Sequence, residues 1–221
     1  MLREILLIGL VGVLCMSCGG TKPKKEEHVP AAPPRAPERD LRPVIVAFGD
    51  SLTAGAGVDP DGNYPAKLQA KIDAGGYEYR VVNAGVSGET SAQGLNRIAS
   101  VIALRPAIVI VEFGGNDGLR GMPAEATRRN LSEIVNRLRS AGSKVVIAGM
   151  QIPPNYGPLY TSSFRNIFPD VARKHDADLI PFFLDGVGGR PELNQDDGIH
   201  PTAEGYEIIV ENVWKVLEAL L

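Results

Sequence analysis

The chain has 221 residues, a formal net charge of −3, 44% hydrophobic residues and 22% charged residues. These values lie near the average for globular proteins, and the length suits one domain with a sizeable hydrophobic core. The charge shows no basic excess and no long run of one sign, so we expect no nucleic-acid partner.

The first 18 residues are predicted to form a signal peptide. Arg3 precedes an apolar run at residues 5–14, which is too short to span a bilayer and typical of a signal-peptide core. Small residues surround Cys18, which indicates a lipoprotein signal with Cys18 as the lipidated residue, although Cys15 stands where such signals usually have leucine. An ordinary cleaved signal peptide is the alternative. Both interpretations predict export to the periplasm, and lipidation would add a membrane anchor, expected in the outer membrane.

Residues 19–42 are predicted to be a disordered tether. This segment is rich in lysine, glutamate and proline, a composition that cannot bury enough apolar surface to fold. Such a tether would hold the following domain, residues 43–221, away from a membrane anchor. A leader without any role is the alternative.

The domain alternates between apolar runs and segments with helical spacing. Buried strands are predicted at residues 44–48, 80–83, 108–112, 144–148 and 178–180, and helices at 66–74, 91–104, 123–141, 162–174 and 202–220. This alternation predicts parallel strands in an α/β fold, a three-layer α/β/α sandwich. The last helix carries an apolar face that we expect to pack in the core, formed by Tyr206, Ile209, Val210, Val213, Trp214 and Leu217.

Neither a cysteine-based nor a multi-histidine site is expected in the domain. Both cysteines precede it, which excludes a disulfide, a thiolate nucleophile and a cysteine zinc site there. The histidines are His28, His175 and His200, and a multi-histidine metal centre is difficult to build from them. We therefore expect no metal and no cofactor.

Small and polar residues follow the predicted strands, and ligands of parallel α/β sheets bind beyond the carboxyl ends of the strands. Gly49-Asp50-Ser51-Leu52 follows the first strand, and residues 83–88 contain the end of the second. Residues 114–117 follow the third strand, and residues 197–201 lie near the C-terminus. We expect these four segments to converge at one edge of the sheet.

Ser51 and His200 are the candidate nucleophile and base of an acyl-transfer site. A serine hydroxyl needs a base within hydrogen-bond reach, and Asp197, three residues before His200, can orient the imidazole from the same turn. His175 is the other histidine of the domain, but it lies at a charged helix end and is expected to be solvated. The backbone N–H groups of Ser51 and Gly85 and the amide of Asn116 are the predicted oxyanion donors.

Each signal alone is weak, because a turn or a helix cap explains Gly-Asp-Ser or Asp-x-x-His equally well. Together, and in this order, the four segments resemble the sequence blocks of the SGNH hydrolases, also called GDSL esterases and lipases. Ser51, Gly85, Asn116 and His200 match the residues that define that family, and Asp197 matches the third member of its triad. The resemblance covers residues 42–221, and it is closest to bacterial arylesterases, thioesterases and lysophospholipases through residues 83–94, 112–121, 152–157 and 195–201.

The resemblance implies a flavodoxin-like sheet of five parallel strands ordered 2-1-3-4-5. It also implies cofactor-free hydrolysis of carboxylic ester and thioester bonds through an acyl-enzyme, with small acyl-ester or lysolipid substrates. Two segments would bind substrate: a loop with Leu119, Arg120 and Gly121, and a stretch with Ile152, Pro153 and Tyr156. The alternatives are a plain loop-to-helix connection for the first segment and a rigid turn for the second.

Two other functions are compatible with the same residues. A carbohydrate acetylesterase could share the fold, but Trp214 lies in a predicted core helix and few aromatic side chains remain for stacking on sugars. A lipoprotein that binds lipid or a partner without turnover is the other, and the full set of catalytic candidates disfavours it. We expect a monomeric esterase.

Overall fold

The structure, a computed structural model, describes residues 40–221. The predicted signal peptide, its lipidation residue Cys18 and residues 19–39 of the predicted tether lie outside the described residues. Within residues 40–221, no helix has the length and apolar character that crossing a bilayer requires.

Five parallel strands form one sheet in the order β2-β1-β3-β4-β5, as the resemblance implies. The predicted α/β fold is therefore confirmed. The strands are β1 (Val44–Gly49), β2 (Arg80–Gly85), β3 (Ile108–Glu112), β4 (Lys144–Ala148) and β5 (Asp178–Ile180).

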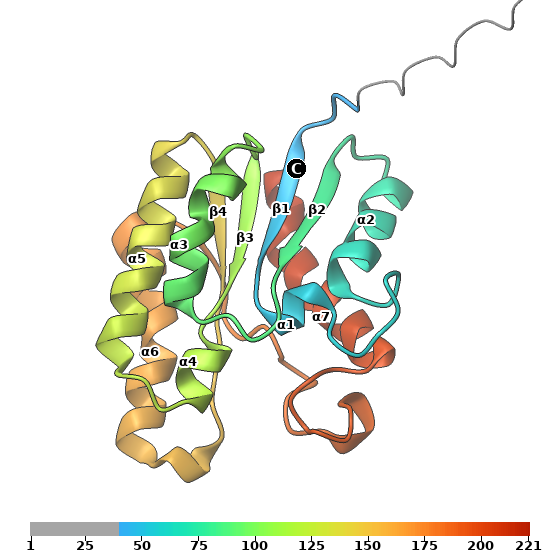
Figure 1. Ribbon diagram of the computed structural model, residues 1–221. Helices are drawn as coiled ribbons and strands as arrows, with labels where there is room; N and C mark the ends of the chain where they lie inside the picture. The colour runs from blue at the N-terminus through green and yellow to red at the C-terminus, as the bar shows by residue number, and fades with distance from the viewer. Residues whose placement is uncertain (1–39) are drawn as a thin grey trace, which may run out of the picture. The chain divides into compact units, whose positions relative to one another are not determined.

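Helices cover both faces of the sheet, which gives three layers (Figure 1). One face carries α3, α5 and α6, and the opposite face carries α2 and α7. The helices are α1 (Ser51–Ala54), α2 (Tyr64–Ala74), α3 (Ser91–Ile102), α4 (Gly115–Leu119), α5 (Ala124–Ser140), α6 (Pro158–His175) and α7 (Ala203–Leu217), with short 3₁₀ turns η1 (Pro154–Tyr156), η2 (Pro191–Leu193) and η3 (Glu218–Leu220).

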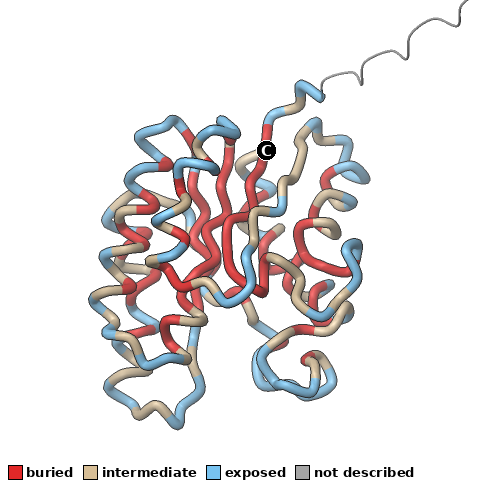
Figure 2. Tube along the Cα trace, in the orientation of Figure 1, coloured by how far each residue is buried: buried red, intermediate tan, exposed pale blue. Residues whose placement is uncertain are grey.

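The core lies between the central strands and the helices, as Figure 2 shows by the buried strands at the centre of the fold. Every residue of β1 and β3 is buried. Strands enclosed on both faces tolerate apolar side chains at every position, which explains the continuous runs in the sequence. Edge strand β2 is only partly buried.

Two helices begin earlier than predicted because a residue that favours a helix start precedes each periodic segment. The side chain of Asn63 accepts a hydrogen bond from the Ala66 backbone N–H at 3.0 Å, so α2 begins at Tyr64 instead of residue 66. Pro158 begins α6 in place of residue 162, since proline suits the first helical position. The short helices α1 and α4 are too brief to show a period and were not predicted.

Helix α7 packs largely as predicted, with Tyr206, Ile209, Val213 and Leu217 fully buried. Trp214 is the exception, because it is only partly buried. Its ring meets the Tyr77 ring edge-on, with the ring centres 5.8 Å apart. The expectation of a core position for Trp214 is therefore corrected to a peripheral one.

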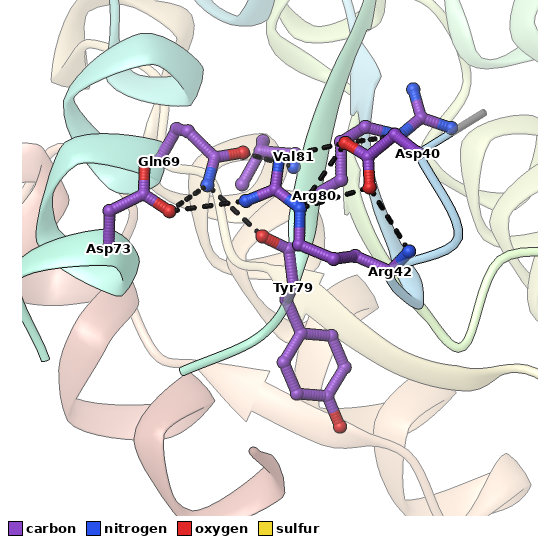
Figure 3. A network of polar contacts seen from close by, with 7 residues as sticks. All are labelled: Asp40, Arg42, Gln69, Asp73, Tyr79, Arg80 and Val81. Carbon is purple, nitrogen blue, oxygen red and sulfur yellow. Dashed lines mark hydrogen bonds and ion pairs between the residues drawn. The ribbon is translucent and has the colours of Figure 1, made fainter. Parts of the chain in front are cut away.

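Charged residues gather where the described chain enters the sheet, at the amino ends of β1 and β2 (Figure 3). The Arg42 guanidinium lies 2.8 Å from the Asp40 carboxylate and 3.3 Å from that of Asp73 on α2. These side chains are more than a third exposed. Hydrogen bonds from Arg42 lower the pKa of Asp40 to about 2.

Gln69 of α2 covers part of the free edge of β2 in the same region (Figure 3). Its side-chain oxygen accepts the Val81 N–H at 2.6 Å, and its amide donates to the Tyr79 carbonyl at 3.1 Å. The amide also donates to Asp73 at 2.9 Å. A single side chain thus satisfies two backbone groups that no neighbouring strand reaches.

Candidate active site

Ser51 is the first residue of α1, directly after β1 and the Gly49-Asp50 turn. The Asp50 side chain caps this short helix by accepting the Leu52 N–H at 3.1 Å. A Cβ at Gly49 would collide with the Thr53 hydroxyl and with Glu112, so glycine is required there. The tight turn presents Ser51 at the carboxyl end of the central strand.

His200 lies between Ser51 and Asp197. Its Nε2 atom is 2.8 Å from the Ser51 Oγ, and its Nδ1 atom is 2.6 Å from the Asp197 Oδ2. The structure therefore brings the three predicted residues together from two segments 149 positions apart. The spacing is that of a nucleophile, a base and an orienting acid.

The second oxygen of Asp197 accepts the backbone N–H groups of Ile199 and His200, each at 3.0 Å. These hydrogen bonds hold the carboxylate within its own turn. The His200 side chain, followed by the two backbone donors, lowers the pKa of Asp197 to about 2. Asp197, whose side chain is 45% exposed, is therefore an anion at neutral pH.

Gln195 fastens the His200 segment to the nucleophile helix, a role that the sequence did not reveal. Its side-chain amide donates to the Ala56 carbonyl at 2.8 Å and to the Pro201 carbonyl at 2.9 Å. Its backbone N–H donates to the His200 carbonyl at 2.7 Å. These hydrogen bonds connect the segment that carries His200 to the backbone that follows Ser51, and so help to set the distance between the two residues.

The structure does not support Gly85 as an oxyanion donor. Its backbone N–H donates to the Asn83 side chain at 2.9 Å. A Cβ at Gly85 would collide with the backbone of Thr53 and Ala54, so this glycine is needed for close packing of β2 against α1. Gly85 therefore serves the packing of β2 against α1 and is not among the residues that line the cavity.

Gly88, three residues further on, lines the cavity next to Ser51. It has φ +80°, and a Cβ built on it would meet open space. Within residues 40–221, no acceptor is bound to its N–H. The segment therefore contains two glycines, of which Gly85 packs against α1 and Gly88 lines the cavity.

Asn116 lies on α4 and faces the nucleophile turn, as predicted. One N–H of its side-chain amide donates to the Asp50 Oδ2 at 3.0 Å. The amide carries a second N–H, which this bond leaves available for a ligand. Gly114 precedes the helix with φ +122°, a conformation that glycine alone adopts readily.

Two buried carboxyl groups lie behind Ser51, and neither was assigned a role from the sequence. Asp50 is 2% exposed and Glu112 is fully buried at the end of β3. Burial raises the pKa of Asp50 to about 6. Burial, followed by the neighbouring Asp50 charge, raises the pKa of Glu112 well above its ordinary range.

A cavity of about 510 Å³ opens beside Ser51 and follows the carboxyl ends of the strands. Its surface is mostly apolar, and its polar lining residues include Ser51, Asn116 and His200. Apolar walls with few polar groups suit an acyl chain or an aromatic ring. The apolar wall includes Leu119, Met150, Ile152, Pro153, Phe182 and Leu184.

Three of the six predicted substrate-binding residues line this cavity, namely Leu119, Ile152 and Pro153. The cavity lining does not include the other three, Arg120, Gly121 and Tyr156, so their prediction as substrate-binding residues is not supported by the geometry.

The Tyr156 hydroxyl donates to the Leu119 carbonyl at 2.7 Å and so joins the two predicted segments. Arg120 donates to the Gly88 carbonyl at 3.0 Å, which ties the loop after α4 to the loop after β2. Gly121 has φ +63°.

His175 lies in the last turn of α6, as predicted, and is not part of this site. The expectation of a solvated side chain is wrong, because His175 is partly buried and its Nε2 is 2.6 Å from the Ser132 hydroxyl. Desolvation, followed by the charge of Lys174, lowers the pKa of His175. In the part of the chain that the structure describes, no cluster of three or more metal-ligating side chains is present.

Comparisons with known proteins agree with the geometry. The pattern of the GDSL-like lipase/acylhydrolase family matches residues 47–208. Esterase TesA of Pseudomonas aeruginosa is 44% identical over 178 residues, which cover 80% of this chain and 89% of the relative. Thioesterase 1/protease 1/lysophospholipase L1 of Escherichia coli strain K12 is 36% identical over 178 residues, with 80% and 84% coverage.

Solved structures show the same relationship. The crystal structure of TesA has a TM-score of 0.79 and covers 80% of this chain and 99% of its own. The structure of the esterase EstA from Pseudoalteromonas sp., inhibited by monoethylphosphonate, has a TM-score of 0.76 at 31% identity, with 80% and 97% coverage.

Proposed function

From the premise that the chain belongs to the GDSL-like lipase/acylhydrolase family, we propose that its serine esterase activity is carried by Ser51, His200 and Asp197. The observation that supports this most directly is the continuous hydrogen-bonded chain from Ser51 Oγ through the imidazole to Asp197. The enzyme class, a carboxylic ester hydrolase, follows from the relatives.

In the first half of the reaction, Ser51 Oγ attacks the acyl carbon while His200 Nε2 takes the hydroxyl proton. Asp197 holds the imidazole through Nδ1 and stabilises the imidazolium that forms. Collapse of the tetrahedral intermediate breaks the bond to the leaving group, which takes the proton from His200. Water then attacks the acyl-enzyme with the same base, and this step releases the acid and restores Ser51.

Three donors would hold the oxyanion: the N–H of Ser51, the N–H of Gly88 and the free N–H of the Asn116 amide. Gly88 replaces Gly85 in this proposal, since the N–H of Gly85 is already bonded within its own turn. Donors that are fixed before the reaction need no reorganisation as charge develops, which is the main source of their effect.

The substrates would be acyl esters, aryl esters, thioesters or lysophospholipids with an apolar chain or ring. The mostly apolar lining of the cavity supports this class, as does the naming of the relatives as esterase, arylesterase and thioesterase or lysophospholipase. Trp214 lies on α7, away from the cavity lining, and offers no stacking surface for a sugar there.

Export and attachment to a membrane through Cys18 complete the proposal, on the evidence of the N-terminal sequence. Metabolic labelling with a fatty acid would test it in the full chain and in Cys18→Ala. Label that is lost in the variant supports the anchor, whereas an unlabelled parent chain contradicts it.

Hydrolysis of p-nitrophenyl esters from acetyl to palmitoyl tests the catalytic assignment. We expect Ser51→Ala to lower kcat by on the order of a millionfold while leaving the fold intact. A matched control is Ser132→Ala, which removes the other serine paired with a histidine and should retain activity. Equal activity of Ser51→Ala and the parent enzyme would overturn the assignment of the nucleophile.

A further inference from the structure

Glu112 is buried behind the nucleophile in a position for which the proposed mechanism has no use. Its Oε2 accepts the Thr53 hydroxyl at 2.8 Å and the Asp50 N–H at 3.3 Å. Its Oε1 is enclosed and meets no hydrogen-bond donor among residues 40–221. An ionised carboxylate would therefore leave one buried oxygen without a partner, which is costly.

A second carboxyl group lies next to Glu112, since the Asp50 backbone N–H donates to the Glu112 Oε2 at 3.3 Å. The charge of Asp50 is one cause of the raised pKa of Glu112, after burial. Within the described residues, neither group forms an ion pair with lysine or arginine. The titratable groups near the pair include Tyr64, Tyr206 and His200, and the interaction with His200 lowers the pKa of Asp50. A second cation, Arg97, donates to the Gly49 carbonyl, next to Asp50 in the chain, at 3.2 Å. Two carboxylates in contact cannot both ionise without a large penalty, so such pairs hold a proton between them.

Asp117 shows how the oxygens of a buried carboxyl group are satisfied elsewhere in the same protein. It is also fully buried, but donors reach both of its oxygens. Ser91 donates from its backbone at 2.8 Å and from its hydroxyl, and Thr127 donates from its hydroxyl at 3.2 Å. Glu112 has a free oxygen where Asp117 has a donor, and a proton on the Glu112 carboxyl removes the charge that this enclosed oxygen would otherwise carry without a partner.

We propose that Glu112 is a positioning residue that carries a proton at neutral pH and shares it with Asp50, so that a single buried negative charge orients the Asn116 amide. The inference rests on the proposed roles of Ser51 and Asn116. The Asp50 carboxylate then receives hydrogen bonds from Leu52 N–H, from the Asn116 amide and from the Glu112 carboxyl. Burial, which raises the pKa of Glu112, agrees with this assignment.

A neutral Glu112 has two consequences for the site. The negative charge stays on Asp50, where the Asn116 amide can bind it, and does not spread over two repelling groups. The amide is then held with its second N–H toward the oxyanion position. Gly49 leaves the space for this arrangement, because any Cβ there would collide with the Glu112 carboxyl.

The first test measures unfolding by denaturant from pH 5 to pH 7 in the parent enzyme and in Glu112→Gln. A carboxyl whose pKa is raised in the folded state stabilises the fold below its unfolded pKa, near 4.5, and this contribution is lost as pH rises. One retained proton changes the unfolding constant about tenfold per pH unit. We therefore expect the ratio of the parent's unfolding constant to that of Glu112→Gln to rise about 100-fold between pH 5 and pH 7.

This measurement does not depend on activity, so it separates failure of the present inference from failure of the proposed catalytic residues. Asp117→Asn is the control, because the proposal predicts that this variant keeps the parent's Glu112 proton. An infrared carbonyl band of a protonated carboxylic acid at pH 7 should be present in the parent and in Asp117→Asn, and absent in Glu112→Gln. A flat stability ratio, or no such band in the parent enzyme, would overturn the proposal.

The second test asks whether Glu112 acts through Asn116. Glutamine keeps the shape of Glu112 and can donate an N–H to Asp50, whereas leucine of similar size cannot. We expect Glu112→Leu to lower kcat about 100-fold with little change in KM, as loss of one oxyanion donor would. Glu112→Gln should recover most of that loss. Equal impairment of both variants when folded, or none in Glu112→Leu, would show that the shared proton does not position the amide.

Discussion

At the amino end of the sheet, Arg42 forms solvent-exposed ion pairs with Asp40 and Asp73. At the carboxyl end, Asp50 and Glu112 are enclosed and form no ion pair with lysine or arginine within residues 40–221. The first arrangement pairs charges where water already stabilises them, so each pair contributes little. The second holds charge where water is excluded, and there every hydrogen bond to it has a large effect.

Charge in this fold is placed according to its use. The exposed ion pairs at the start of the described chain cost little free energy to form and stabilise the fold little. Buried carboxyls destabilise the fold at neutral pH, and such groups persist where a function needs them. Substitutions at the two ends should therefore differ sharply in their effect on rate, and the following changes test that contrast.

Asp197→Asn should give the largest effect of these changes, a fall in kcat of about 10⁴. The asparagine side chain keeps the shape but can present an N–H to His200 Nδ1, which favours the wrong tautomer for proton transfer from Ser51. Steady-state hydrolysis of a p-nitrophenyl ester measures the change. An unaltered kcat would mean that the 2.6 Å contact between Asp197 and His200 has no catalytic role.

Asn116→Ala should lower kcat by about 10²- to 10³-fold, because it removes one oxyanion donor. KM should change little, since the donor acts mainly on the charge of the transition state. Asn130→Ala serves as the control, because Asn130 binds Ser91 and lies outside the cavity lining. A fall confined to binding affinity would contradict a transition-state role for Asn116.

The two glycines after β2 should respond in opposite ways. Gly85→Ala forces a Cβ into the backbone of α1 and should lower the unfolding free energy by about 3 kcal/mol. Gly88→Ala meets open space and should cost only about 1 kcal/mol of backbone strain from its positive φ. Denaturant unfolding measures both. For the folded enzymes, kcat should fall more in Gly88→Ala, and the reverse order would restore Gly85 as the donor.

Arg42→Ala should have the smallest effect. Its ion pairs are exposed and screened by salt, so the melting temperature should shift little and kcat should match that of the parent enzyme. Repeating the melt at low and at high salt provides the check, since any contribution from Arg42 must shrink as salt rises. A large loss of activity in this variant would show that the two ends of the sheet are coupled.

Much of the fold could be predicted from the sequence, because the central strands are short apolar runs that helices cover on both faces of the sheet. The strands β1, β3, β4 and β5 lie within one residue of the predicted ranges. Helix boundaries were less accurate, since the Asn63 cap and the first-position proline Pro158 set them locally, whereas apolar periodicity does not.

The site was only partly predictable. Asp197 and His200 are recognisable because an orienting acid and a base can lie three residues apart in one turn, and Ser51 because it follows a buried strand. The choice between Gly85 and Gly88 depends on which glycine packs against α1, and that is a tertiary property. Glu112 gave one signal, a charged residue that ends an apolar strand, but its meaning depends on Asp50, 62 residues away.

Gln69 has a consequence for the behaviour of the protein in solution. Strand β2 is an edge of the sheet, and an uncovered edge is a template on which another polypeptide can add a strand. The Gln69 side chain occupies the Val81 N–H and the Tyr79 carbonyl, so an incoming strand must first displace it. One amide on a neighbouring helix therefore protects this edge against amyloid-like polymerisation.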